Sequence, residues 1–438
     1  MGSQKGVDIL IVGAGVLGVT LAYWLSSLYD CRILLIDQGM GIAPHTSSRN
    51  TGVIHRPFYL DPRAKRVFAR TSEASYPLWR DLAKEFGLWW NQVGTLEAAV
   101  NEAQVSTLEE YSRWGHENGI AESELQLLDK ASARALEPEV DCKAALFSKA
   151  DVSVDFGQLT RLVFRLASAN GVNFLGGQEV MSARRDKDGG VEVGLRSKKG
   201  PWLVRCRVLL NAAGAGALRI AHMLGSAREY SAMYFRGEYW FVDEPFASRV
   251  GRNVYTPPKY PEFPFLDPHF VVRYDGRRQI GPNAVLVAGP YSYQGPGFAS
   301  FGTALEAPNA PKLNLLRSRT FLAMVGKEWR SSLSKRAMCS RVKEFIPALR
   351  PEALRSRGVS GIRGSVIGEG GFVPEALLFH DRRVLHVVNY NSPGATGAPA
   401  YSAMLVAELR KEGSLEGFRT KAAGSHSRWD FDRALAAL

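Results

Sequence analysis

Three glycines near the start of the chain have a spacing that can hold a nucleotide. Gly13, Gly15 and Gly18 form the pattern G-x-G-x-x-G. The first glycine of this pattern permits a tight turn, the second lets the backbone approach a pyrophosphate, and the third lets a helix pack closely on a strand. Asp37 follows about 20 residues later, at a position suited to accept hydrogen bonds from a ribose hydroxyl. These residues predict dinucleotide binding, and the acid at position 37 disfavours NADP.

The segments around the glycines have the patterns of the elements that must position them. Residues 7–12 (VDILIV) form a short apolar β-run, residues 19–28 show apolar side chains at helical spacing, and residues 32–36 form a second β-run. In this order of strand, turn, helix and strand, the phosphates lie at a helix N-terminus, where free N–H groups and the helix dipole favour anions. The start of the chain is therefore predicted to be a Rossmann-type unit.

Two more small-residue turns follow far along the chain. One is the strand-like run VLLNAAG at residues 208–214, and the other is VVNYNSPGATG at residues 387–397, before an apolar helical run. Three such turns spread over the whole length favour one long ligand held by a discontinuous domain. FAD is such a ligand, with its adenosine end expected near Gly13 and Asp37 and its isoalloxazine near Gly394 and Gly397.

Composition and charge exclude several classes of protein. The 438 residues are 45% hydrophobic and 22% charged, which is typical of a globular protein with a sizeable core. The net charge is +12, but its basic residues are scattered, so we predict no nucleic-acid partner and leave open a contact with an anionic membrane surface. No run reaches the ~18 apolar residues of a membrane span. Widely spaced cysteines predict a cytoplasmic protein without a metal site; they are Cys31, Cys142, Cys206 and Cys339.

Five further motifs carry a resemblance to a known family. They are SSRNTGVIH at 47–55, FRGEY at 235–239, FPFL at 263–266 with His269, GPNA at 281–284, and SPGAT at 392–396. With these motifs the chain resembles the FAD-dependent D-amino-acid-oxidase type over about residues 7–409. Its motifs are most similar to the L-2-hydroxyglutarate dehydrogenase branch, and the chain also looks like the dye-linked L-proline dehydrogenases. The resemblance implies a discontinuous FAD-binding domain with a mixed-sheet α+β substrate domain.

The segments that would surround a substrate depart from the hydroxyglutarate branch. Residues 56–60 (RPFYL) have an apolar side chain where the branch has a second tyrosine, and residues 372–377 (FVPEAL) are largely apolar. A dicarboxylate needs two sets of charge-assisted donors, because an unpaired buried carboxylate is costly. We therefore predict a small amino acid, L-proline first. L-2-hydroxyglutarate is the alternative, and a flavin-binding subunit without catalysis is a third hypothesis.

The resemblance also implies the roles of single residues. Arg363, in Gly-Ile-Arg, is expected to hold the substrate carboxylate, with His55, His269 and Tyr59 as catalytic candidates around the flavin N5 that accepts a hydride. Tyr255 is a weaker candidate, and Arg236 is expected to pair with Glu238. The electrons are expected to pass to a dye or quinone, whereas oxygen reactivity and covalent attachment of the flavin stay open. The predicted cofactor-binding residues are Gly13, Gly15, Val16, Gly18, Asp37, Gln38, Ser48, Arg49, Asn50, Thr51, Gly52, Val180, Ala213, Gly214, Ser392, Gly394, Ala395, Thr396 and Gly397.

The chain is divided on this basis into three parts. The FAD-binding domain is predicted at 1–87, 140–226 and 358–416, and the substrate domain at 227–357 with a helical segment at 88–139. Residues 288–311 are loop-like and are expected to form a lid or a homo-oligomer contact. The tail at 417–438 is expected to end in an amphipathic helix that docks on its own domain, with covering of the pocket or contact with a partner as the alternatives.

Overall fold

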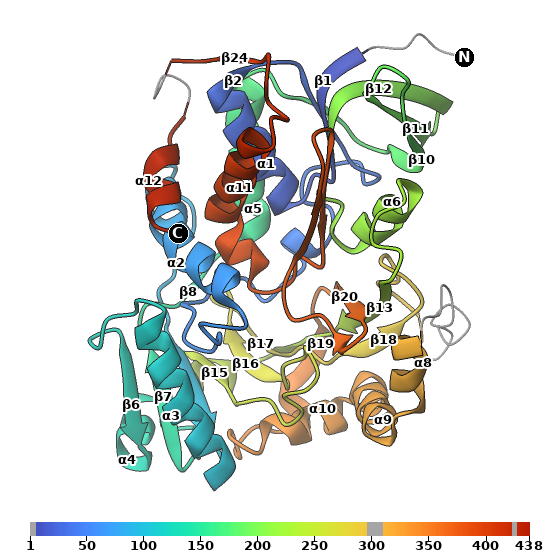
Figure 1. The fold of residues 1–438 in the computed structure, drawn as a ribbon. Coiled ribbons are helices and arrows are strands. Elements are labelled where there is room, and N and C mark those ends of the chain that lie inside the picture. Colours follow the sequence, from blue (N-terminus) through green and yellow to red (C-terminus); the bar gives the residue numbers. More distant parts are fainter. Residues whose placement is uncertain (1–5, 296–309, 423–426) are drawn as a thin grey trace.

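The computed structural model describes residues 6–295, 310–422 and 427–438. Two units lie one above the other, as Figure 1 shows, and the chain passes between them several times. Within the described part of the chain, no helix is long and apolar enough to cross a membrane.

The upper unit is built on an eight-stranded sheet with the order β10-β11-β12-β1-β3-β9, extended at β12 by β23 and β22. Strands β1, β3, β9, β12 and β23 run parallel, and β10 to β12 form an antiparallel meander. The predicted Rossmann-type order of strand, glycine turn and helix is confirmed. The strands are β1 (Gly6–Val12), β3 (Ile33–Ile36), β9 (Asn173–Leu175), β10 (Glu179–Arg185), β11 (Val191–Ser197), β12 (Gly200–Asn211), β22 (Leu377–His380) and β23 (Val384–Val388).

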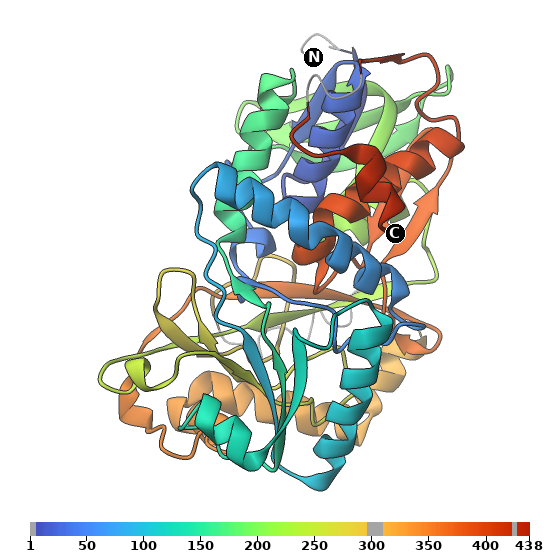
Figure 2. The ribbon, with the colours of Figure 1, turned by 90° about the vertical axis from the view of Figure 1, so that its left-hand side faces the viewer.

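Helices cover the two faces of this sheet unequally. Alternate residues of β1 point to opposite faces, so that Ile9 and Ile11 pack under helices while Leu10 and Val12 pack towards the meander. The first face carries α1 (Val16–Leu28), α5 (Phe156–Ala169) and α11 (Gly394–Lys411), and the second carries the short α6 (Ala217–Met223). The long helix α2 (Arg66–Glu85) runs along the junction of the two units and packs on α11 (Figure 2).

The lower unit has a second eight-stranded sheet, with the order β19-β14-β17-β16-β15-β5-β7-β6. A four-stranded sheet, β18-β13-β20-β21, lies between this sheet and the upper unit. The strands are β5 (Thr95–Ala99), β6 (Leu125–Asp129), β7 (Ala144–Ser148), β13 (Ser231–Gly237), β14 (Trp240–Val242), β15 (Asn253–Tyr255), β16 (His269–Val272), β17 (Arg278–Gly281), β18 (Val285–Val287), β19 (Leu354–Arg357), β20 (Gly361–Gly368) and β21 (Gly371–Phe372).

Helices flank the lower unit, and two short strand pairs lie outside the main sheets. Buried side chains of α10 fill the core on one face of the large sheet. The helices are α3 (Glu102–Glu117), α4 (Lys130–Leu136), α8 (Ala310–Arg317), α9 (Arg319–Leu333) and α10 (Lys335–Val342). The short pairs are β4 (Val53–Ile54) with β8 (Val152–Ser153), and β2 (Tyr29–Asp30) with β24 (Arg419–Thr420).

The segment 88–139 was predicted to be helical, and this is wrong in part. Helices α3 and α4 lie in it, but so do strands β5 and β6. Both strands pair with β7, which lies in the range assigned to the FAD-binding domain. Likewise β20, assigned to that domain, pairs with β13 of the predicted substrate domain. The sheet that a strand joins depends on distant partners, which local periodicity does not reveal.

The C-terminal helix docks on its own unit, as predicted. It is shorter than expected, α12 (Phe431–Ala436), and Asp430 caps its N-terminus by accepting the N–H of Arg433. The preceding Trp429 is 5% exposed and packs edge-on against Tyr23. The tail therefore completes the core around α1 and α2. Of the loop predicted at 288–311, residues 296–309 lie outside the described residues.

Candidate active site

A cavity of about 820 Å³ runs between the two units, from the glycine turn after β1 to the strands of the lower unit. Arg363, His55, His269 and Tyr59 all line it. So do all the predicted cofactor-binding residues except Gly18, Ser48 and Gly397. The tertiary structure therefore brings together residues that the sequence distributes from position 13 to position 396.

The glycine turn has the shape of a cradle for phosphate. Gly13 has a φ of +107°, and a Cβ there would lie 2.3 Å from the carbonyl oxygen of Ala212. Gly15 is the N-cap residue of α1 and lines the cavity. Next to it, the Ser47 hydroxyl accepts the N–H of Val16 at 2.9 Å. A side chain on Gly13 would therefore clash with the backbone after β12, whereas one on Gly15 would enter the space at the helix N-terminus that an anion needs. The cradle fits the pyrophosphate of a dinucleotide.

Three predicted residues have structural roles outside the cavity lining. A Cβ on Gly18 would lie 1.9 Å from the carbonyl oxygen of Gly13, so this glycine permits helix α1 to pack on its own turn. A Cβ on Gly397 would come within 2.8 Å of the Thr71 hydroxyl, where α11 packs on α2. The Ser48 hydroxyl donates to the carbonyl oxygen of Ala43. Ser47, the neighbour of Ser48, is the serine that lines the cavity.

Asp37 lies at the end of β3 and holds the loops around it. Its Oδ2 accepts the N–H of Ala14 at 2.8 Å, and its Oδ1 accepts the N–H of Gly39 at 2.7 Å. Burial raises the pKa of the Asp37 carboxyl, against the lowering effect of these two hydrogen bonds. Each carboxylate oxygen keeps a second lone pair, so contact with a ribose hydroxyl stays a prediction compatible with this geometry.

The opposite end of the cavity holds a histidine paired with a buried carboxylate. His55 Nδ1 lies 2.7 Å from Asp151 Oδ2, and Asp151 is completely buried. The other oxygen, Oδ1, accepts the N–H of Arg56 and the hydroxyl of Ser148. Because a carboxylate can only accept, Nδ1 carries the hydrogen and the lone pair of His55 lies on Nε2, 3.3 Å from the Tyr255 hydroxyl.

A second histidine lies on the other side of Tyr255. The rings of His269 and Tyr255 stack with their centroids 3.8 Å apart, and His269 Nδ1 donates to the carbonyl oxygen of Asp267 at 3.1 Å. Burial lowers the pKa of His269 to about 3, so the ring is neutral. Its Nε2 is buried and has no hydrogen-bond partner among the residues that the structure describes. Because His269 lines the cavity, this atom is an unsatisfied acceptor at the cavity wall.

Arg363 supplies the positive charge at this end of the cavity. It extends from β20, its side chain is half-buried and lines the cavity, and it donates to the carbonyl oxygen of Pro264. Within residues 6–295, 310–422 and 427–438, no carboxylate forms an ion pair with it. Burial lowers its pKa, against the raising effect of the Tyr59 and Tyr239 phenols. This guanidinium, half-buried and lining the cavity, therefore fits a carboxylate ligand.

The tyrosines around Arg363 are neutral donors. Burial raises the pKa of both Tyr59 and Tyr239 above the usual value for a phenol. The ring of Tyr59 also lies edge-on to His55, at 5.8 Å between centroids. Tyr59 and Tyr239 therefore can hydrogen-bond a carboxylate that Arg363 attracts.

Some residues of the site were not predicted. Asp151 has no signal in the sequence, because an aspartate after a short strand is common. Tyr239 ends the FRGEY motif at 235–239 but was not chosen as a site residue. Ser47 belongs to the SSRN motif, where only its neighbour was chosen. The predicted pairing of Arg236 with Glu238 is confirmed at 2.8 Å, and it also places Arg236 donors on the carbonyl oxygens of Ser292 and Gly295.

Comparison with known proteins gives a consistent result. Residues 8–409 match the family described as FAD dependent oxidoreductase. The L-2-hydroxyglutarate dehydrogenase of Escherichia coli O17:K52:H18 is 26% identical over 405 residues, covering 92% of this chain and 93% of that protein. The mitochondrial L-2-hydroxyglutarate dehydrogenase of Homo sapiens is also 26% identical, over 93% of this chain and 90% of its own length.

Solved structures share the fold at lower identity. The L-alpha-glycerophosphate oxidase of Mycoplasma pneumoniae with FAD bound superposes with a TM-score of 0.73 at 22% identity, covering 97% of this chain and 98% of its own. The L-proline dehydrogenase of P. horikoshii gives a TM-score of 0.66 at 18% identity, with 98% of each chain covered. These likenesses confirm the fold class and carry no substrate assignment.

Proposed function

The chain belongs to the FAD dependent oxidoreductase family, and from this premise we propose that it oxidises a 2-hydroxy carboxylate to the 2-oxo acid, with L-2-hydroxyglutarate as the first substrate to test. FAD is its cofactor, and the glycine cradle at the N-terminus of α1 would hold the pyrophosphate. One observation carries the proposal: the His55–Asp151 pair shares a cavity with the Arg363 guanidinium.

The histidine–aspartate pair favours an alcohol over an amine as the reacting group. A hydroxyl is nearly as weak an acid as water, whose pKa is about 15.7, so its oxidation requires a base at the oxygen. An alkylammonium, with a pKa of about 10.4 in lysine, releases its proton to water much more readily. His55 has its lone pair on Nε2 towards the cavity, and the Asp151 carboxylate stabilises the cation that forms when that atom takes a proton.

The residues of the site have separate roles in this reaction. Arg363 binds the substrate carboxylate, with the Tyr59 and Tyr239 hydroxyls beside it. His55 accepts the hydroxyl proton, directly or through the Tyr255 hydroxyl. Bound FAD supplies the two-electron acceptor for the hydride that leaves C2 of the substrate. The substrate thus loses one hydride and one proton and becomes a 2-oxo acid.

Relatives support L-2-hydroxyglutarate because they match over nearly the whole chain. L-proline is kept as a second candidate because Phe235, Phe265 and Leu266 line the cavity near Arg363 and suit a monocarboxylate with an apolar ring. A quinone or another electron carrier is proposed as the final acceptor. Family membership and the histidine–aspartate pair oppose the hypothesis of a flavin subunit without catalysis.

The test is anaerobic loss of the oxidised-flavin absorbance after mixing with substrate. L-2-hydroxyglutarate, its D-enantiomer and L-proline are compared at equal concentrations. Rapid bleaching by the L-hydroxy acid, with the D-enantiomer inactive, is the expected result. Bleaching by L-proline alone contradicts the 2-hydroxy carboxylate proposal and transfers support to the amino acid. Bleaching by none of the three contradicts both candidates.

A further inference from the structure

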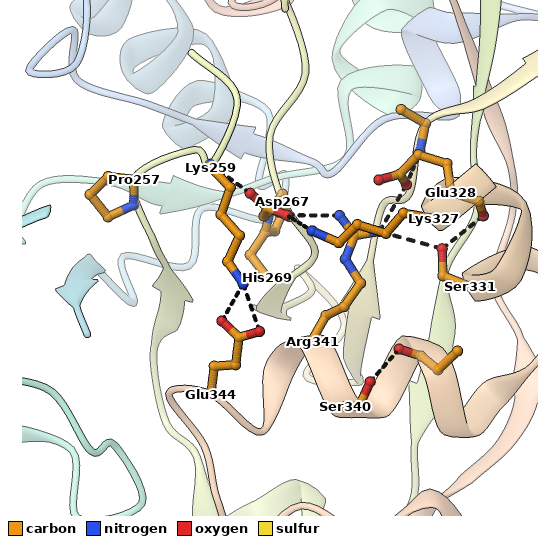
Figure 3. A network of polar contacts seen from close by, with 12 residues as sticks. Pro257, Lys259, Asp267, His269, Lys327, Glu328, Ser331, Ser340, Arg341 and Glu344 are labelled. Carbon is orange, nitrogen blue, oxygen red and sulfur yellow. Dashed lines mark hydrogen bonds and ion pairs between the residues drawn. The ribbon is translucent and has the colours of Figure 1, made fainter. Parts of the chain in front are cut away.

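A cluster of charged side chains lies behind the wall of the cavity, on the side of the lower unit. Figure 3 shows Arg341 and Lys327 turned towards Asp267, with Lys259 and Glu344 beside them. Arg341 Nη2 donates to Asp267 Oδ1 at 2.8 Å, and Lys327 Nζ lies 3.6 Å from the same oxygen. The other oxygen of Asp267 accepts the backbone N–H of Lys259 at 2.9 Å. The carboxylate of Asp267 is thus fixed on both of its oxygens.

Arg341 also reaches a second part of the cavity wall. Its Nη1 donates to Glu328 Oε2 at 2.8 Å, and the same oxygen accepts the N–H of Ala284 at 2.9 Å. Ala284 lines the cavity, and the Arg341 side chain is only 9% exposed. A single guanidinium from α10 therefore connects the loop that ends at β16 with the turn that precedes β18.

The charge of Asp267 is directed away from His269. Burial opposes ionisation of Asp267, but the charge and hydrogen bond of Arg341 hold its pKa below the usual value. Towards His269, Asp267 offers only its backbone carbonyl oxygen, which accepts the Nδ1 hydrogen at 3.1 Å. This contrasts with His55, whose Nδ1 faces the carboxylate of Asp151. The Nδ1 partner is thus a carboxylate for His55 and a neutral backbone carbonyl for His269.

We propose that Arg341 is a positioning residue that acts through Asp267 to hold His269 with its Nε2 lone pair in the cavity, where it accepts a hydrogen bond from the reacting substrate. The assignment of a substrate donor at Nε2 rests on the proposed function. Nε2 is the orphan acceptor of a ring that is 2% exposed, and the substrate hydroxyl is the donor that would satisfy it. The ion pairs of Arg341 with Asp267 and Glu328 form a clamp. This clamp holds the loop before β16, and with it the His269 ring, in position.

The test is a double-mutant cycle between α10 and the cavity. His269→Asn keeps a donor near the Nδ1 position and removes the Nε2 acceptor, while Arg341→Met removes the clamp and keeps most of the side-chain volume. The rate of anaerobic flavin reduction at saturating substrate is expected to fall at least tenfold in each single variant. If Arg341 acts through His269, the double variant is no slower than His269→Asn alone. Losses that multiply in the double variant overturn the proposal.

A second measurement separates positioning from general destabilisation. The flavin spectrum is titrated with the 2-oxo acid product, which binds without reacting. In Arg341→Met the product dissociation constant is expected to change less than threefold, because Arg363 is intact. Arg341→Lys keeps the charge but cannot bind Asp267 and Glu328 through two separate nitrogens. Its rate of flavin reduction should lie between those of Arg341→Met and the wild type. Equal losses of rate and product binding would mean that the whole site has collapsed, and this contradicts the proposal.

The control is Arg336→Met, an exposed arginine on the same helix, which should match the wild type in both measurements. If Arg341→Met does not fold, Asp267→Asn tests the same link, since it removes the carboxylate and keeps the carbonyl. The cycle is run with whichever substrate reduces the wild-type flavin. Failure of the 2-hydroxy carboxylate proposal, with L-proline active instead, therefore leaves the cycle interpretable.

Discussion

Nδ1 of His55 lies 2.7 Å from Oδ2 of Asp151, although 96 positions separate the two residues in the sequence. The short strands β4 and β8, which pair in antiparallel register, bring the two segments together. The guanidinium of the adjacent Arg56 pairs with Glu73 and Glu124 and leaves Asp151 to the histidine. This selective pairing fixes the tautomer of His55, as its proposed role of base requires.

Replacing Asp151 by asparagine tests this base. Asp151→Asn keeps the side-chain shape and removes the charge that stabilises protonated His55. The rate of flavin reduction by substrate should fall about 100-fold or more, the usual size of a general-base contribution. FAD content, measured from the absorbance spectrum, should not change. Asp81→Asn, at a site where the carboxylate is 63% exposed, is the control, and an equal loss in both variants would contradict the role.

Arg363→Met should weaken substrate binding strongly. The variant removes the cation in the cavity wall that would pair with the substrate carboxylate, so the apparent dissociation constant should rise at least 100-fold, or about 2.7 kcal/mol. Stopped-flow reduction at increasing substrate concentration measures it. Arg355→Met, an arginine on the neighbouring β19 that is 78% exposed, should behave like the wild type. Saturation of Arg363→Met at wild-type concentrations would refute the assignment.

Glu97 makes the protein less stable as the pH rises. Burial, and then the charge of Asp151, raises the pKa of Glu97 to about 8. Between the pKa of a free glutamate, about 4.3, and this value the folded state holds a proton that the unfolded chain has released, so stability falls with pH by at most about 5 kcal/mol. Glu97→Gln should therefore raise the melting temperature more at pH 8 than at pH 5. The control is Glu102→Gln, whose carboxylate is 80% exposed. An equal gain at both pH values would exclude the titration of Glu97 as the cause.

Valine substitutions at Gly15 and Gly18 should have different effects: one on FAD binding, the other on folding. Valine at Gly18 meets the Gly13 carbonyl, with its Cβ at 1.9 Å, so Gly18→Val should prevent folding or lower the melting temperature steeply. Valine at Gly15 meets only the Ser47 hydroxyl at 3.1 Å and then extends into the cavity. Gly15→Val should fold and lose FAD, measured by absorbance and by melting of the FAD-free protein. A Gly15→Val variant that binds FAD normally would exclude the phosphate cradle.

Trp429 should contribute to stability and not to substrate binding. Its ring packs between Tyr23, Trp24 and Trp79, and its indole N–H donates to the carbonyl oxygen of Leu78. Trp429→Ala should cost about 3–5 kcal/mol of unfolding free energy and leave the KM for substrate unchanged. Trp89→Ala, at a tryptophan that is 57% exposed, should cost little. A change of KM in Trp429→Ala without loss of stability would instead support the pocket-covering role.

The cofactor end of the site was largely predictable because its signals are local. Gly13, Gly15 and Asp37 fall within one strand, turn, helix and strand, and the constraints on φ and on close approach act between near neighbours in the chain. The catalytic end was predictable only in part. Arg363, His55 and His269 line the cavity as expected, but Asp151 and Arg341 have no local pattern that marks them.

The sequence by itself determined the Rossmann-type start, the cofactor class and the residue types offered to a substrate, since these depend on short-range periodicity and spacing. Only the tertiary structure decided that β5, β6 and β7 form part of the lower sheet, and that β20 carries Arg363 into the cavity from a strand paired with β13. It also decided which carboxylates face which cations. Strand pairing and ion pairing are satisfied by partners far apart in the chain, and their choice follows from burial and geometry in the complete fold.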